Sequence, residues 1–437
     1  MCLRSKNKYA GMKKSLHFCF KCLFSLVYAF VLFEIGLRLF PGLIPLNLLI
    51  LFNEGPRVEI ARRRELPTKD WDTVVVERDD GGPELRIYKP FTRLTWTVGT
   101  YETVVMDEMG FCNLPQNSYQ LPTIDIITLG DSFTACHAVT PQDTWSSQLS
   151  MLTGLSVYNL GRVKIGIHEY IQLLKKFGLQ KSPRIVILNV YEGNDFRDAR
   201  RYYRAVNKNA AQSDATFVDN ISSPLPPKSN FIGSDWLERH SYAFNLFLSL
   251  LSYADQTYFN PPPPNELEKI NFKYRFVFLD EISIPFNSEN VDRDEVQSAR
   301  YMTTLQTSSE VLDAIEDALK TFVDLSEQYD FVPVVTYTPS AHTAYVEYVV
   351  FDDPNLTGLM PSFSHEQRQY LNAKSKELGY VFIDFTPSLQ AAAQANGPQK
   401  LLYYPLDLHL TPAGHAAVAN ILNQALNDLG ILARRGE

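Results

Sequence analysis

The feature that most constrains the fold is an alternation of short apolar runs with helical segments, which begins at Pro122 and continues to the C-terminus. The run Arg184–Val190 is largely apolar throughout, which is typical of a strand buried on both faces. Five such runs are present: Ile124–Leu129, Val157–Leu160, Arg184–Val190, Phe331–Thr336 and Val381–Asp384. Strands that alternate with helices predict a three-layer α/β/α fold around a mostly parallel sheet of about five strands.

Helix signals separate and follow these runs. The last segment has Pro412 in its first turn and Gly430 beyond its end, the asymmetry that helix ends prefer. We expect helices over Pro141–Leu152 (stopped by Gly154), Gly166–Phe177, Glu310–Tyr329, Ser364–Leu378 (capped by Ser364) and from Thr411 to just before Gly430.

The N-terminus predicts a membrane anchor over residues 1–52. Basic residues between Arg4 and Lys14 precede the mostly apolar Leu16–Phe33, and the stretch continues to Phe40, close to the roughly 20 residues that span a bilayer. No small-residue cleavage site follows, which favours an uncleaved signal anchor with a cytoplasmic tail and an extracytoplasmic remainder. The arginines at 57 and 62–64 count against this orientation. The alternative is a buried core helix.

Residues 53–120 predict a small β-rich lead-in, with a hairpin formed by Thr73–Glu77 and Leu85–Tyr88 and further strands in Thr95–Val105. The α/β domain would then cover 121–437, with an insertion at about 198–301 that contains two proline clusters, 224–227 and 261–264. Within the insertion, His240–Tyr253 is apolar on most of its circumference. It is either a helix that covers the core or a surface that contacts an acyl group or the membrane.

Composition excludes several classes of function. A net charge of −8 without a basic stripe argues against nucleic-acid binding. The five cysteines provide no disulfide framework, and Cys19 and Cys22 lack a second pair of ligands, so we expect no metal site and no cofactor. Cys112 and Cys136 can pair in an oxidising compartment, which the sequence alone leaves open.

Polar residues stand where the predicted strands end. Gly130-Asp131-Ser132 follows the first strand, Asn159-Leu160-Gly161 ends the second, and Gly193-Asn194-Asp195 follows the third. Asp407-Leu408-His409 precedes the last helix, and in an extended backbone its spacing places the acid and the imidazole on the same side. Gly-Asp-Ser alone is also an ordinary turn. Beside a base, however, its serine is a candidate nucleophile at the sheet edge where ligands bind.

These four blocks, in this order, resemble the SGNH (GDSL-like) hydrolase family from about Pro122 to the C-terminus, and the N-terminal anchor resembles its membrane-anchored bacterial members. The resemblance implies an SGNH/flavodoxin-like sheet and a Ser132-His409-Asp407 triad. It also implies an oxyanion hole made of the Ser132 N–H, a glycine N–H of the second block and the Asn194 amide. Asp131, Gly193 and Asp195 would support the loops.

The second block departs from the family pattern, because Lys164 stands where the oxyanion glycine is expected. The Lys164 N–H acts as the oxyanion donor if the backbone angles at this position suit a residue with a Cβ. Otherwise Gly161 or Gly166 donates. The charges of Arg162 and Lys164 would favour an anionic substrate, or they belong to a solvated loop.

The sequence therefore predicts an extracytoplasmic serine esterase that acts on an ester-bearing small molecule, lipid or glycan. One alternative is an O-acyltransferase that uses the same triad on an extracytoplasmic glycan, and another is a non-catalytic binding protein on a degenerate hydrolase fold. Among the remaining candidates, Cys136, His137 and His342 are expected near the pocket, and His415 is expected to be structural. The sequence does not specify the acyl group or the oligomeric state.

Overall fold

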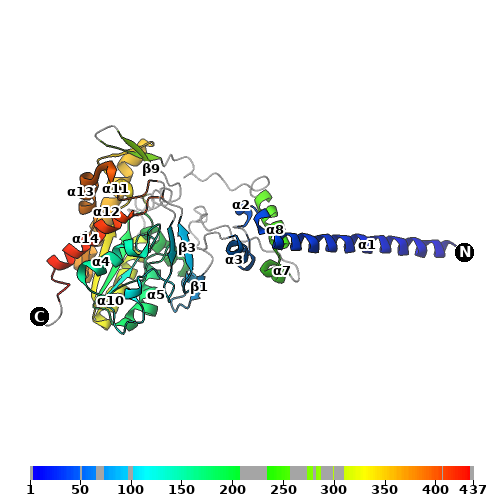
Figure 1. Cartoon of the computed structure of the whole chain (residues 1–437), viewed down its shortest axis with the longest axis horizontal. Coiled ribbons are helices and arrows are strands. Elements are labelled where there is room, and N and C mark those ends of the chain that lie inside the picture. Colours follow the sequence, from blue (N-terminus) through cyan, green and yellow to red (C-terminus); the bar gives the residue numbers. More distant parts are fainter. Residues whose placement is uncertain are drawn as a thin grey trace. The chain divides into compact units, whose positions relative to one another are not determined.

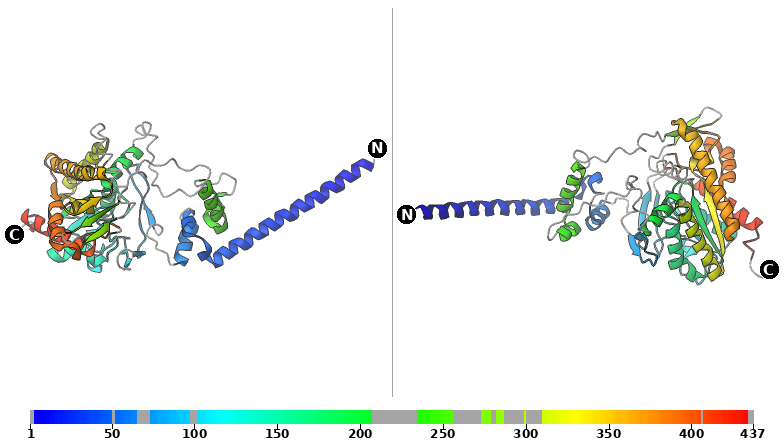
Figure 2. Two further views of the ribbon diagram at one scale, coloured as in Figure 1. Left: turned by 90° about the horizontal axis from the view of Figure 1, so that it is seen from above. Right: turned by 180° about the vertical axis from the view of Figure 1, so that it is seen from behind.

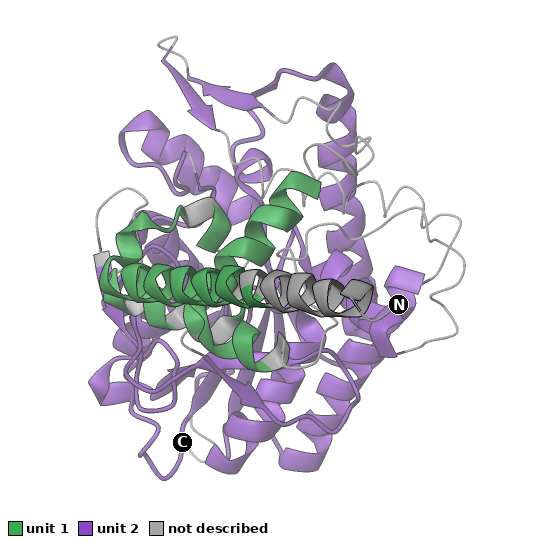
Figure 3. Ribbon diagram, turned by 90° about the vertical axis from the view of Figure 1, so that its right-hand side faces the viewer, with its two compact units in different colours: residues 1–71, 217–264 green, residues 72–216, 265–437 purple. Residues whose placement is uncertain are grey.

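The computed structural model describes residues 3–49, 52–64, 73–96, 102–206, 234–255, 273–278, 282–286, 299, 310–405 and 407–433. The chain divides into two compact units, one made of residues 1–71 and 217–264 and the other of 72–216 and 265–437 (Figure 3). Both proline clusters of the insertion, 224–227 and 261–264, lie outside the described residues.

The second unit contains the predicted parallel sheet. Its strands are β5 (Ile126–Leu129), β6 (Val157–Asn159), β7 (Ile185–Tyr191), β10 (Val332–Thr338) and β12 (Val381–Asp384). They lie in the order β12-β10-β7-β5-β6, and every pair is parallel. This is the flavodoxin-like order, in which the direction of winding reverses between β5 and β7. The predicted sheet is confirmed.

Helices cover both faces of this sheet (Figure 1 and Figure 2). Side chains of α4, α13 and α14 share one apolar core with Ile126, Ile187 and Val334. Side chains of α5, α10 and α12 share the other core with the adjacent residues of the same strands. The bounds are α4 (Trp145–Thr153), α5 (Ile167–Leu173), α10 (Glu310–Tyr329), α12 (Pro354–Leu378), α13 (Thr386–Asn396) and α14 (Pro412–Asp428).

Shorter elements complete the second unit. A three-stranded antiparallel sheet in the order β11-β8-β9 comes from segments that the sequence pattern did not mark as strands. The elements are η2 (Pro115–Asn117), η3 (Pro141–Asp143), a π-helical turn η4 (Leu174–Gly178), η5 (Leu179–Lys181), α6 (Asp195–Val206), β8 (Tyr274–Val277), β9 (Ser283–Phe286), α11 (Ala341–Ala344), β11 (Val349–Phe351) and η8 (Gly397–Gln399).

Two segments differ from the expected bounds. Helix α12 begins at Pro354 with Asp353 as its N-cap, whereas Ser364 lies inside the helix and donates its hydroxyl to Glu192 at 2.9 Å. Pro361 inside α12 hides the continuity of the helix, because an internal proline normally ends one. Asp198, near which the insertion is expected to begin, lies within α6, which continues to Val206.

Residues 72–120 of the lead-in belong to the second unit and contain two antiparallel hairpins, whereas residues 53–71 belong to the first unit, where 54–63 form a helix and not a strand. The predicted hairpin is β1 (Thr73–Val76) with β2 (Leu85–Tyr88), and the second is β3 (Arg93–Trp96) with β4 (Glu102–Val105). The β3–β4 hairpin shares a small apolar core with Ala135. A disulfide between Cys112 and Cys136 joins the lead-in to the segment that follows Ser132, which answers the question left open by the sequence.

The described part of the first unit contains the helices α1 (Leu3–Leu39), η1 (Pro41–Leu43), α2 (Leu46–Leu49), α3 (Glu54–Arg63), α7 (Ser234–His240) and α8 (Tyr242–Ala254). Among the described residues, one segment of α1, Phe20–Leu39, has the length and hydropathy to cross a membrane (20 residues, mean hydropathy 1.9). Tyr242 and Ala243 of α8 pack with Leu37, Ile44 and Phe52. The interpretation of α8 as a cover for the sheet core is therefore wrong, because its buried side chains belong to the core of the first unit.

Candidate active site

The sheet topology brings the four polar blocks together. Ser132 follows β5, Asn159 ends β6, and Asn194 follows β7, so all three lie at the carboxyl ends of neighbouring strands. The strands β5 and β7 lie side by side where the winding reverses, which is the place where open α/β sheets bind ligands. The segment with Asp407 and His409 reaches the same place, just before α14.

Three side chains form a continuous chain of hydrogen bonds. The Ser132 hydroxyl lies 2.7 Å from His409 Nε2, and His409 Nδ1 lies 2.7 Å from Asp407 Oδ1. His409 is 8% exposed, whereas Ser132 is partly open to solvent. A serine that is accessible and bonded to an imidazole, which is in turn oriented by a carboxylate, has the geometry of an activated nucleophile.

A turn brings Asp407 and His409 together, and not the extended backbone that their spacing suggested. Leu408 has a φ of 65°, so the segment is a turn and not extended backbone. The Leu408 N–H donates to the Tyr404 carbonyl at 2.8 Å, and the Tyr404 N–H donates to the His409 carbonyl at 2.9 Å. A left-handed backbone costs a residue with a Cβ about 1–2 kcal/mol. Burial of the Leu408 side chain, which is 1% exposed, offsets this cost.

A second imidazole contacts the same carboxylate. The ring of His137 stacks on that of His409, with ring centroids 3.7 Å apart, and the His409 ring also stacks on Phe133 at 4.7 Å. His137 Nε2 donates to Asp407 Oδ2 at 3.3 Å and lies 3.2 Å from Oδ1. Burial alone would raise the pKa of Asp407, but hydrogen bonds from His137 and His409 outweigh it and hold that pKa well below its usual range. The Asp407 carboxylate is therefore ionised.

The nucleophile loop is held by its own backbone and by Asp131. The Asp131 carboxylate accepts the Phe133 N–H at 2.9 Å, and its carbonyl accepts those of Thr134 and Ala135. Burial raises the pKa of Asp131 to about 6. Gly130 is required here, because a Cβ would lie 2.1 Å from Thr134 Oγ1. These contacts fix the turn that presents Ser132.

The second block supports the nucleophile loop through Asn159. Its Nδ2 donates to the Thr134 carbonyl at 2.7 Å, and its Oδ1 accepts the Gly161 N–H at 2.8 Å. A Cβ on Gly161 would lie 2.6 Å from the Ala135 nitrogen, so this glycine permits close packing of the two loops. The Gly166 N–H donates to Glu169 Oε2 at 3.2 Å. The N–H groups of both candidate glycines are thus engaged within their own loop.

Lys164 retains the backbone conformation that glycine favours. Its φ is 64°, in the left-handed region, and its side chain is exposed. Arg162, by contrast, is buried, with its guanidinium 4.0 Å from the centre of the Tyr88 ring and a 2.8 Å hydrogen bond to the Val163 carbonyl. The Arg162 side chain therefore packs against Tyr88 of the lead-in and does not supply charge for an anionic substrate.

Asn194, in the third block, contacts the buried carboxylate of Asp198. Asn194 Nδ2 donates to Asp198 Oδ2 at 3.0 Å, and Arg197 holds that carboxylate at 2.9 Å. Asn194 Oδ1 is buried and has no hydrogen-bond donor within the described part of the chain. Buried acceptors without a donor are rare in native proteins. Gly193 lies in the turn between β7 and α6.

Asp195 anchors this turn. It accepts the Tyr170 hydroxyl at 2.5 Å and the Tyr191 N–H at 2.7 Å. Burial and the nearby charge of Asp131 raise the pKa of Asp195 well above its usual range. The carboxylates of Asp131 and Asp195 thus accept backbone N–H groups at the ends of β5 and β7.

The two other candidate histidines, His342 and His415, are buried in the structure. His342 is 3% exposed, and its Nδ1 lies 3.2 Å from the Thr343 hydroxyl. His415 Nδ1 accepts the Trp145 N–H at 3.2 Å, and burial lowers the pKa of His415 to about 3. Sequence reasoning placed His137 only near the pocket, and it missed Asp198 altogether. For Asp198 its position four residues after Asn194 on a helix was the available signal.

His137, Asp407 and His409 also lie close enough to one another to hold a metal ion, since their ligand atoms are within 4.8 Å. In the structure these atoms contact one another at hydrogen-bond distances, and His409 Nε2 contacts Ser132. The arrangement of donors and acceptors fits a hydrogen-bonded triad.

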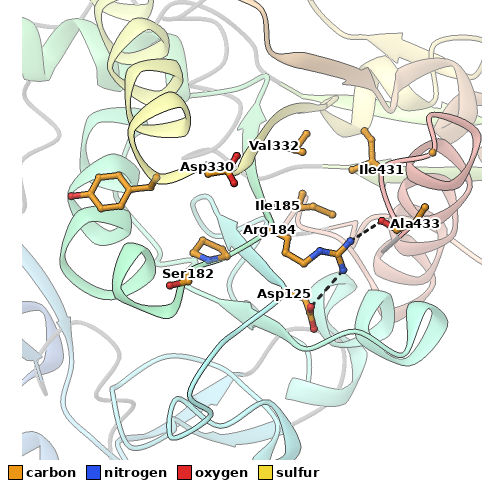
Figure 4. A pocket seen from close by; sticks show the side chains of 11 residues that line it. Asp125, Ser182, Arg184, Ile185, Asp330, Val332, Ile431 and Ala433 are labelled. Atoms are coloured by element: carbon orange, nitrogen blue, oxygen red, sulfur yellow. Dashed lines mark hydrogen bonds and ion pairs between the residues drawn. The ribbon is translucent and has the colours of Figure 1, made fainter. Parts of the chain in front are cut away.

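A cavity of about 660 Å³ lies at the other edge of the sheet, where β5, β7 and β10 begin (Figure 4). Arg184 lines it and contacts Asp125 at 3.6 Å and the Ala433 carbonyl at 2.9 Å. Because Ser132 follows the opposite ends of these strands, this cavity is separate from the triad.

No protein-family model matches the sequence, and no curated protein matches it. Solved structures similar to this chain include a putative lipolytic protein of the G-D-S-L family from Desulfitobacterium hafniense (13% identity, 70% of this chain, 100% of that chain, TM-score 0.33). Also similar are an acetyl xylan esterase (12%, 69%, 100%, 0.33) and a catalytic mutant of an acetylxylan esterase from Geobacillus stearothermophilus (11%, 71%, 96%, 0.34). At such identities and TM-scores, the site's own geometry carries the functional argument.

Proposed function

We propose that this protein is a serine esterase in which Ser132 is the nucleophile, His409 the general base and Asp407 the residue that orients the base. The observation that carries the proposal is the pair of 2.7 Å contacts that link the three side chains at the carboxyl edge of the sheet. A serine hydroxyl is a weak nucleophile without such a base.

The reaction proceeds in two halves. In the first, Ser132 Oγ attacks the ester carbonyl while His409 Nε2 takes the hydroxyl proton, and the tetrahedral intermediate collapses as His409 returns that proton to the leaving alcohol. In the second, His409 takes a proton from water, the hydroxide attacks the acyl-serine, and the acid leaves as Ser132 recovers its proton. Asp407, ionised throughout, stabilises the imidazolium form of His409 in each half.

The oxyanion of the intermediate needs donors that are already in position. We assign these to the backbone N–H groups of Ser132 and Lys164 and to the Asn194 amide. The left-handed φ of Lys164 supports its inclusion, because it preserves the backbone conformation of a glycine at that position. The bond from Gly161 to Asn159 argues against Gly161 as the donor. The hydrogen bond to Asp198 fixes the plane of the Asn194 amide.

His137 acts in this scheme as a positioning residue. Its contacts to both oxygens of Asp407 and its stacking on His409 restrain the acid and the base together. A carboxylate held by two imidazoles keeps its orientation while His409 gains and loses a proton. The Cys112–Cys136 disulfide restrains the backbone immediately before His137.

We further propose that α1 anchors the protein in a membrane and that the triad faces an extracytoplasmic compartment. The segment Phe20–Leu39 has suitable length and hydropathy, and it lies almost entirely at the surface. The Cys112–Cys136 disulfide supports an oxidising compartment, since disulfides persist in secreted and periplasmic proteins and are rare in the cytosol.

The test is hydrolysis of p-nitrophenyl acetate by the full chain in detergent. Ser132→Ala should lose the activity, whereas Ser375→Ala, which removes a hydroxyl from the outer surface of α12, should keep it. Equal turnover by the wild type and by Ser132→Ala would refute the assignment of the nucleophile.

A further inference from the structure

Helix α8 is attached to the last turns of α1 although about two hundred residues separate them in the sequence. Glu34 of α1 accepts the Ser241 hydroxyl at 2.9 Å and the N–H groups of Tyr242 at 3.2 Å and Ala243 at 2.8 Å. A carboxylate at these unpaired N–H groups is favourable for the N-terminus of a helix. Arg38 pairs with Glu34 at 2.7 Å and lies over the Tyr242 ring at 4.5 Å. The start of α8 is thereby held at the level of Glu34.

Beyond its apolar first turn, α8 buries polar side chains and exposes apolar ones. Asn245 and Ser249 are buried in the first unit, at 3% and 0% exposure. Phe247, Leu250 and Leu251 are 55%, 48% and 52% exposed, and their i, i+3, i+4 spacing places them on one face. An amphipathic helix on the surface of a soluble protein places apolar residues inward and polar residues outward. Each such side chain forgoes part of the free energy of burial if water covers it.

Hydrogen bonds fix this orientation. Asn245 Nδ2 donates to the carbonyls of Glu238 at 2.8 Å and Ser241 at 2.7 Å, and its Oδ1 accepts the Asn53 N–H at 2.7 Å. Rotating α8 to bury its leucines would break these bonds as well as the cap by Glu34. The apolar face is therefore held outward by the structure of the unit.

We propose that the face formed by Phe247, Leu250 and Leu251 lies in the headgroup and acyl boundary of the lipid bilayer that α1 crosses. The occupant follows from continuity with α1, because the apolar segment that can span a membrane ends at Leu39, five residues beyond the glutamate that caps α8. Leu39 and Phe40 are themselves 64% exposed. An interfacial helix with an outward apolar face buries that face about 5–10 Å into this boundary.

This contact gives the protein a second attachment to the membrane in addition to the span. Trp236 of α7, which is 64% exposed in the same unit, is of the residue type enriched at headgroup level. The part of the insertion that belongs to the first unit, 217–264, then serves to hold that unit on the membrane surface, independently of the chemistry at Ser132.

The test uses the full chain in vesicles of phosphatidylcholine and phosphatidylglycerol. Cys2, Cys19 and Cys22 are replaced with serine, and Leu250→Cys is labelled with the fluorophore NBD. Met151→Cys, on α4 of the other unit and 61% exposed, is the matched control. We expect the label at 250 to lose most of its emission to doxyl-labelled lipids and little to iodide in solution, with the reverse at 151.

Phe247→Cys provides a second labelled site on the same face, one turn away, and should behave as 250 does. Quenching by iodide as strong at 247 and 250 as at 151 would show that water covers the face. Protection from both quenchers would show that protein covers it. Either result overturns the proposal.

Discussion

Replacing His137 with phenylalanine isolates the contact between the second imidazole and Asp407. Phenylalanine keeps an aromatic ring against His409 but removes the N–H that lies 3.3 Å from Asp407 Oδ2. A hydrogen bond to a charged group contributes about 1.5–3 kcal/mol, and at this length we take the lower end. A loss of about 1.4 kcal/mol from the transition state lowers a rate about tenfold.

We therefore expect His137→Phe to lower kcat for p-nitrophenyl acetate about tenfold with little change in KM, because His137 does not contact the substrate in the scheme above. His137→Gln places a donor at nearly the reach of the imidazole Nε2 and should recover most of kcat. Thermal unfolding of both variants checks that the fold is retained.

If His137 served only to stabilise the fold, kcat of the two variants would not follow this pattern. If kcat of His137→Phe stays within about twofold of the wild type, or if glutamine is as damaging as phenylalanine, then His137 does not position Asp407.

Four further outcomes follow from the structure. Asn194→Ala should lower kcat about 10²–10³-fold in the same assay, the usual cost of an oxyanion donor. Lys164→Gly should keep kcat and raise the free energy of unfolding in urea by about 1 kcal/mol, because glycine adopts the φ of 64° without strain. Replacing Cys112 and Cys136 together with serine should lower that free energy by about 3 kcal/mol. Burial lowers the pKa of His415 to about 3 from 6.5, so the unfolded chain binds the proton first as pH falls. Stability should therefore be complete above about pH 6.5 and fall toward pH 3, and His415→Gln should flatten this dependence.

Each of these has a clear contrary result. Full activity in Asn194→Ala would remove the amide from the oxyanion hole, and a loss of kcat in Lys164→Gly would give the lysine side chain a role. Unchanged stability without the disulfide, or an unchanged pH dependence in His415→Gln, would contradict the corresponding physical argument.

The sheet was predictable because its signals are local. The strand β7 is apolar apart from Asn189 and is buried along its whole length, and Glu310–Tyr329 carries a helical period that matches α10. The start of α12 was not predictable, because Pro361 interrupts the local signal while tertiary packing maintains the helix.

The residues of the site were visible as polar blocks at strand ends, but their contacts were not. The contact between Asp407 and His409 depends on the left-handed backbone of Leu408. A leucine in the sequence gives no indication of that conformation. Similarly, His137 reaches Asp407 from 270 residues away. The place of α8 beside α1 depends on Glu34 and Ser241, which lie 207 residues apart.

The central claim is that Ser132 is activated by His409, and covalent labelling tests it most directly. The full chain is treated with a fluorophosphonate, digested and analysed by peptide mass spectrometry. We predict one adduct, on Ser132, that is absent from Ser132→Ala and forms far more slowly in His409→Ala. An unmodified Ser132 in the wild type, or equal labelling in the presence and absence of His409, would contradict the account.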